Sequence, residues 1–240
     1  WALQNAGYAL TGWDGVIAGD VPIGAGLSSS AALELATARA FGATSNFPWS
    51  APIMAKLGQK AENQWVGMNC GIMDQMISAA GKAGHALLID CRTLDSELVP
   101  LPPGTLVVVL DTATRRGLVD SAYNERRAQC EAAAQFFGVP ALRDVTPEMF
   151  EERAAGLDEV TRRRARHVIT ENARTLQAAD VMRQGDAVAL GKLMDASHVS
   201  MRDDFEISRA EMDKMVELAQ QHPASYGARM TGGGFGGAAV

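Results

Sequence analysis

The hydrophobic residues of this chain follow two spacings, which separate predicted strands from predicted helices. Short aliphatic runs bounded by glycine or proline are typical of strands, and they predict strands over 16–23, 84–90 and 105–111. Longer segments place apolar residues three to four positions apart, as in helices that are apolar on one face. They predict helices over 28–41, 52–66, 119–137, 148–155, 158–184, 186–200 and 213–221.

Strands and helices are mixed in both halves, which favours an α+β fold over a regular doubly wound sheet. A segment rich in proline and glycine, residues 100–104, interrupts the chain between two predicted strands. We therefore expect two domains, 1–104 and 105–240.

Composition narrows the class of protein. With 240 residues, of which 47% are hydrophobic and 21% charged, the chain can bury a core. A net charge of −6 argues against a general nucleic-acid or anionic-membrane surface, and the arginine cluster 162–166 is interpreted as a solvated helix face. Three widely spaced cysteines support neither a disulfide framework nor a zinc site. We expect a cytoplasmic protein without nucleic-acid or membrane partners.

A glycine turn that runs into serines and then a helix is the most informative local motif. It comprises Gly24, Ala25, Gly26, Leu27, Ser28, Ser29 and Ser30. Glycine lets backbone N–H groups converge on an anion, and the first turn of a helix offers unpaired N–H groups and a partial positive charge. The motif predicts a phosphate site. The alternative is a serine that caps an ordinary helix.

No Walker phosphate loop occurs in the sequence, because no lysine follows a correctly spaced glycine pair. A phosphate ligand would therefore need its charge neutralised by Mg²⁺.

Two carboxylates are candidates for the accompanying chemistry. Asp74 lies in a short apolar segment that begins at Gly71, where a carboxylate could orient a substrate hydroxyl or accept its proton. It could equally cap the helix that follows. Glu62 could share Mg²⁺ with a serine of the glycine turn, although most helical glutamates face solvent.

Three features of the second half complete the candidates. Residues 230–237 hold a second glycine cluster, which could pass close to a phosphate or form a flexible linker. Tyr123, near a predicted helix start, could reach a polar substrate or simply pack. His198 is interpreted as tying a helix end to its neighbour rather than as a catalytic group.

Together these motifs resemble the GHMP small-molecule kinases. The resemblance rests on 22–32 and 230–237, and 70–75, 84–92, 121–127 and 202–208 are similar to the galactokinase branch of that family. It implies a two-domain fold with an N-terminal domain like ribosomal protein S5 and a ferredoxin-like C-terminal domain, truncated at both ends. It also implies transfer of phosphate from ATP to the C1 hydroxyl of galactose.

The resemblance further implies roles for individual residues. Residues 24–30 would bind the ATP phosphates, and Ser30 and Glu62 would hold Mg²⁺. Asp74 would be the catalytic base or orienting group, and Gly71, Asp74 and Tyr123 would contact the sugar.

The ends of the chain read as cut, so we expect an internal fragment of a longer polypeptide. The family's sugar-recognition signature would precede Trp1, and we therefore expect the fragment itself to be inactive or nearly so. We also expect a monomer. The alternatives are a related GHMP sugar kinase, such as one acting on N-acetylgalactosamine, and a non-enzymatic sensor of galactose and ATP. The complete serine turn and Asp74 favour the enzyme.

Overall fold

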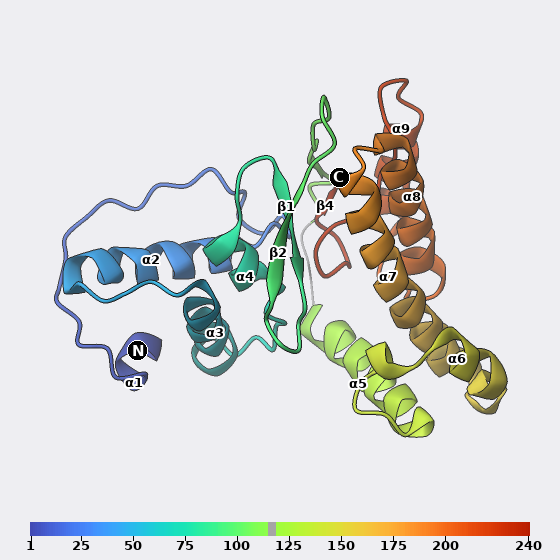
Figure 1. Cartoon of the computed structure of the whole chain (residues 1–240), viewed down its shortest axis with the longest axis horizontal. Coiled ribbons are helices and arrows are strands. Elements are labelled where there is room, and N and C mark those ends of the chain that lie inside the picture. The colour runs from blue at the N-terminus through green and yellow to red at the C-terminus, as the bar shows by residue number, and fades with distance from the viewer. Residues whose placement is uncertain (115–118) are drawn as a thin grey trace. The chain divides into compact units, whose positions relative to one another are not determined.

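A computed structural model describes residues 1–114 and 119–240 (Figure 1). The chain divides into two compact units, Trp1–Leu101 and Pro102–Val240, whereas the sequence prediction put the division between 104 and 105. Each unit has hydrophobic cores of its own. No helix within the described residues is both long and apolar enough to cross a membrane.

Unit 1 is a small helical cluster with one hairpin. Its helices are α1 (Ala2–Asn5), α2 (Ser29–Ser45), α3 (Ala51–Ala61) and α4 (Met73–Ala80), and a π-helical turn, Glu62–Val66, continues α3. Strands β1 (His85–Ile89) and β2 (Ser96–Pro100) pair antiparallel, with Leu87 opposite Leu98. Helices α2, α3 and α4 pack against one another. Gln75 in the first turn of α4 donates to Glu34 of α2, and Gly58 of α3 lies beside the same Glu34 side chain.

Unit 2 is mainly helical. It contains α5 (Val119–Phe137), α6 (Pro147–Arg153), α7 (Glu159–Arg183), α8 (Ala187–Asp203) and α9 (Ala210–Gln220), with 3₁₀ turns at Leu142–Asp144 and Ala154–Gly156. Strands β3 (Leu110–Asp111) and β4 (Ala238–Ala239) pair antiparallel and bring the end of the chain back to the start of the unit.

Side-chain caps explain where three of these helices begin. The side chains of Thr146, Asp158 and Asp186 each accept a hydrogen bond from a backbone N–H in the first turn of α6, α7 and α8. The side chain of Ser28, which precedes α2, makes no such bond, and neither do the side chains that precede α3, α4 and α9. The Ser28 hydroxyl is therefore not used by its own helix.

The helix predictions are confirmed, with shifts of a few residues at their ends, and the hairpin strand predicted over 84–90 is confirmed as β1. Two strand predictions are wrong. Residues 16–23 form no strand, and of 105–111 only Leu110–Asp111 does. Val16 is 94% exposed and Leu106 90% exposed, and among the described residues neither 16–23 nor 105–109 pairs with a strand. An aliphatic run becomes a strand only where a neighbour accepts its hydrogen bonds.

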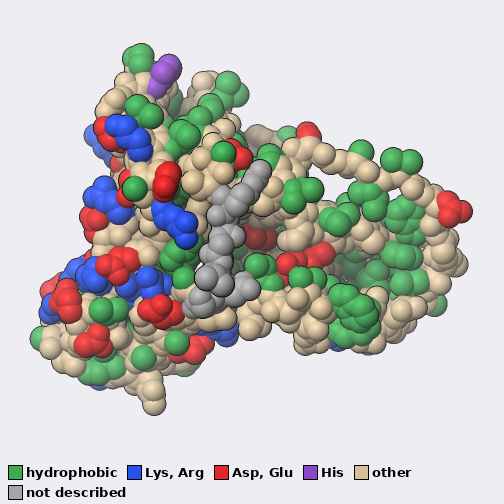
Figure 2. All heavy atoms as spheres, turned by 180° about the vertical axis from the view of Figure 1, so that it is seen from behind, with side chains coloured by type: hydrophobic (Ala, Val, Ile, Leu, Met, Phe, Trp, Pro, Cys, Tyr) green, Lys and Arg blue, Asp and Glu red, His purple; other side chains and the backbone are tan. Residues whose placement is uncertain are grey.

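Charged side chains are unevenly distributed. On the face in Figure 2, acidic and basic side chains are interspersed over the helices of unit 2, and unit 1 shows mainly hydrophobic and uncharged side chains. Neither unit presents a broad basic surface on that face, which agrees with the net charge of −6.

Candidate active site

The glycine turn before α2 has the backbone geometry of an anion site. Gly24 and Gly26 have φ of 76°, and Ser28 has φ of 63°, while the residues between them have negative φ. Alternating signs of φ are a feature of the concave backbone nests that bind anions. Ala25 anchors the turn, since it is only 1% exposed.

The first turn of α2 extends this geometry. Ser28 does not cap the helix with its side chain, while its carbonyl accepts from the Ala32 N–H at 3.0 Å. Ser28 and Ser29 are half-buried and Ser30 is exposed. The N–H groups and hydroxyls at this helix start are therefore available to an anion, which the helix dipole also favours.

One buried and one half-buried carboxyl lie close together in the same unit. Glu34 of α2 lies close enough to Glu62, the first residue of the π-helical turn after α3, for the two carboxyls to share a proton. The Gln75 amide of α4 donates to Glu34 Oε2 at 3.3 Å. Burial first, and the Glu62 carboxyl second, raise the pKa of Glu34 to about 8. The three side chains join α2, the end of α3 and the start of α4.

The residues around Glu62 fit a cation. Glu62 is 4% exposed. When Glu34 and Glu62 are both ionised, no group among the described residues donates a hydrogen bond to Glu62 Oε2. Such a buried oxygen requires either a proton on its neighbour or a cation. No group of three or more His, Cys, Asp or Glu in the described ranges could hold a metal. A Mg²⁺ ion would thus rely on one or two carboxylates, a serine hydroxyl and phosphate oxygens, as magnesium sites often do.

Asp74 lies in the first turn of α4, half-buried and next to Gln75. Gly71 is exposed in the loop that leads into this helix. The loop is held by Cys70, whose N–H donates to Asn63 Oδ1 at 2.9 Å and whose carbonyl accepts from the Gln59 amide at 3.1 Å. These bonds fix the entry to α4 and therefore the placement of Asp74.

The remaining sugar candidate, Tyr123, belongs to unit 2, where it is 38% exposed in α5. The second glycine cluster is also in unit 2. Its Phe235 N–H donates to the Ile207 carbonyl at 2.7 Å, and a Cβ on Gly234 would lie 2.6 Å from that same carbonyl. The cluster is therefore a closely packed loop and not a linker, because only glycine fits at Gly234.

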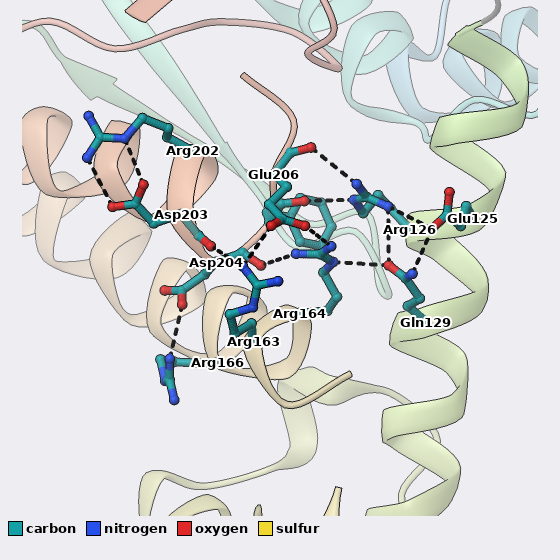
Figure 3. A network of polar contacts seen from close by, with 11 residues as sticks. Glu125, Arg126, Gln129, Arg163, Arg164, Arg166, Arg202, Asp203, Asp204 and Glu206 are labelled. Atoms are coloured by element: carbon teal, nitrogen blue, oxygen red, sulfur yellow. Dashed lines mark hydrogen bonds and ion pairs between the residues drawn. The ribbon is translucent and has the colours of Figure 1, made fainter. Parts of the chain in front are cut away.

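An arginine network supports this loop (Figure 3). Arg164 of α7 is 2% exposed and donates to Gln129 of α5 at 3.0 Å, to the Asp204 carbonyl and to the Glu206 carboxylate. Arg126 of α5 donates to the Phe205 carbonyl at 2.7 Å and lies 5.9 Å from the Phe235 ring centre. The turn after α8 is thus bound to α5, α7 and the glycine cluster.

The interpretation of the 162–166 cluster as a solvated face is wrong for Arg164. The spacing of apolar residues along α7 does not predict that Arg164 is buried. An arginine side chain is expected to be exposed to solvent unless an acidic partner elsewhere in the chain neutralises it. That partner is Glu206, whose pKa is lowered first by Arg164 and then by Arg163.

The interpretation of His198 is confirmed. The side chain is 3% exposed in α8, its Nδ1 accepts from the Met230 N–H at 3.3 Å, and its Nε2 lies 3.2 Å from Asp213 of α9. His198 therefore connects α8 to α9 and to Met230, the first residue of the glycine cluster. Burial lowers its pKa, so the ring is held in its neutral form.

Comparison with known proteins agrees with this arrangement. The family described as "GHMP kinases N terminal domain" matches residues 1–82, and "GHMP kinases C terminal" matches 178–240. The chain belongs to the GHMP kinases, and it has their two-domain fold.

Within that family, the chain is similar to the galactokinase of Lactococcus lactis, whose crystal structure was determined in complex with galactose. The TM-score is 0.90 and the sequence identity 35%, over 99% of this chain. The chain spans 63% of the length of that galactokinase.

Proposed function

We propose that the protein carrying this sequence transfers the γ-phosphoryl group of ATP to the C1 hydroxyl of D-galactose, giving galactose 1-phosphate. The observation that carries the proposal is the uncapped, serine-rich start of α2 in the same unit as Glu62 and Asp74. The similarity to a galactokinase supports galactose as the sugar.

The proposed roles are those that the family resemblance implies, and the geometry of unit 1 supports the roles given to 24–30, Glu62 and Asp74. The N–H groups and hydroxyls of 24–30 bind the ATP phosphates, and Ser30 and Glu62 hold Mg²⁺. The ion neutralises phosphate charge when bound. Asp74 orients the sugar hydroxyl or accepts its proton, while Gly71 and Tyr123 contact the sugar. Phosphoryl transfer depends mainly on such positioning and charge neutralisation.

A substrate panel tests the proposal. The complete gene product is assayed with ATP and Mg²⁺ against galactose, N-acetylgalactosamine, glucose and mevalonate. We expect turnover with galactose, with the phosphate on C1 as identified by ³¹P NMR. Preference for N-acetylgalactosamine would assign a different sugar. Binding of galactose and ATP without turnover would indicate a sensor.

Replacing Ser30 by Ala tests the phosphate and metal site. The hydroxyl is proposed to contact charged ligands, and a hydrogen bond to a charged group contributes about 1.5–3 kcal/mol. We expect kcat/KM for MgATP to fall by at least about tenfold, since 1.4 kcal/mol corresponds to a factor of ten. Ser78→Ala, on the exposed surface of α4, is the control. An unchanged kcat/KM in Ser30→Ala would remove Ser30 from the site.

A further inference from the structure

We infer that Glu34, which the family resemblance did not single out, is a second carboxylate of the divalent-cation site. The inference rests on the proposed function, because it concerns the cation that accompanies ATP. It assigns Glu34 a part in holding that cation together with Glu62 and Ser30.

The first observation is the position of Glu34 on its helix. Glu34 follows Ser30 by four residues in α2. Residues at this spacing are neighbours on one helix face, and a long helical side chain leans toward the preceding turn. Glu34 is therefore on the same face as the Ser30 hydroxyl, one turn further into the helix.

The second observation is that Glu62 meets Glu34 with an oxygen left unpaired. Glu62 is more than nine-tenths buried, and its Oε2 finds no donor in the part of the chain that the structure describes. Gln75, 1% exposed, is also incompletely satisfied, since its Oε1 is buried without a described partner. These buried acceptors gather around the contact between the two carboxyls, which is the environment that a cation would complete.

The third observation is that the surrounding helices hold Glu34 in place. The Gln75 amide donates to Glu34 Oε2, which fixes one oxygen of the carboxyl. Helix α3 presents Gly58 to the same oxygen, and a Cβ at that position would lie 3.2 Å from it. The carboxyl is therefore positioned by its neighbours rather than free to turn into solvent.

Two ionised carboxylates in contact would repel each other, and burial removes the water that would weaken the repulsion. Without a positive charge the pair must therefore hold a proton, and a divalent cation would take the place of that proton. If Glu34 served only as a neutral hydrogen-bond donor to Glu62, a glutamine at this position would leave the affinity for the cation unchanged. If Glu34 contributes negative charge to the site, the same substitution would weaken cation binding.

The experiment measures Mn²⁺ binding by electron paramagnetic resonance in the complete gene product with a non-hydrolysable ATP analogue. We expect Glu34→Gln to raise the Mn²⁺ dissociation constant about tenfold, because the number of charged ligands tunes metal affinity. The thermal midpoint of the metal-free variant should be close to that of wild type, since the glutamine amide can donate to Glu62 as the protonated Glu34 carboxyl does. Glu97→Gln makes the same charge change on the exposed face of β2 and should leave Mn²⁺ affinity unchanged.

Unchanged Mn²⁺ affinity in Glu34→Gln, together with weakened binding in Glu62→Gln, would overturn the inference and leave the proposed function standing. Unchanged affinity in both variants would overturn the metal assignment as well. If Glu34→Gln does not fold, Glu34→Asp and Glu34→Ala replace it. The inference then requires that Glu34→Asp bind Mn²⁺ more tightly than Glu34→Ala. Equal Mn²⁺ affinities of these two variants would overturn it.

Discussion

Replacing Asp74 by Asn in the complete gene product should lower kcat for galactose phosphorylation about 10³-fold, since a positioned acid or base contributes roughly 10²–10⁴. Asn keeps the size of the side chain and removes its negative charge and its ability to accept a proton. Asp74 lies in the first turn of α4, which the Cys70 loop and Gln75 hold in place. Steady-state kinetics with galactose and MgATP measure the effect.

The binding of both substrates separates a chemical role from a structural one. Dissociation constants from calorimetry should change far less than kcat, because Asn preserves the shape of the site. Asp14→Asn, an exposed position in the same unit, is the control with the same change of charge. A kcat for Asp74→Asn near that of wild type would remove Asp74 from the chemistry.

The second large effect is expected in stability. Glu206→Gln should lower the free energy of unfolding by about 3 kcal/mol, because it leaves the buried Arg164 guanidinium without its carboxylate. This value is at the lower end for breaking a buried ion pair, since the Glu206 side chain is itself 43% exposed. Urea denaturation of the two proteins gives the difference.

The pH dependence gives this prediction a further signature. The folded-state pKa of Glu206 is lowered by Arg164 and Arg163, so its contribution to stability is present above the unfolded-state pKa. It is lost as the pH falls through the folded-state pKa. The difference between wild type and Glu206→Gln should therefore be full at neutral pH and shrink in acid.

An exposed ion pair serves as the control. Glu159→Gln removes the partner of Arg162 at the start of α7, where the two side chains are 60% and 35% exposed. Such pairs contribute about 0–1 kcal/mol. Equal destabilisation by Glu159→Gln and Glu206→Gln would contradict the importance of the buried network.

The helices and turns that could be predicted from the sequence are those determined by residues close together in the chain. Helices such as α5 and α7 follow from the spacing of apolar residues, and the turn before α2 follows from glycines and serines at fixed positions. Asp74 could be named as a candidate because it is a carboxylate in a short apolar segment that begins at Gly71, and Glu62 because it lies on the predicted helix 52–66 that precedes this segment. The structure places them on helices of one unit.

The features that sequence reasoning missed depend on contacts between distant segments. Arg164 is buried because Glu206, in the turn after α8, neutralises it, and no periodicity encodes that pairing. The strands expected at 16–23 and across 105–109 need partners to form. Glu34 was missed although a signal existed, since it follows Ser30 at the spacing of one helical turn. The spacing alone does not indicate a function for Glu34, and its contact with Glu62 is seen only in the structure.

A crystal structure of the complete gene product with Mg²⁺, a non-hydrolysable ATP analogue and galactose would locate the nucleotide. We predict phosphate oxygens within hydrogen-bonding distance of the N–H groups of 26–30, and the Asp74 carboxylate beside the C1 hydroxyl of the sugar. Phosphates bound away from the start of α2, or Asp74 turned away from the sugar, would contradict the kinase site described for this chain.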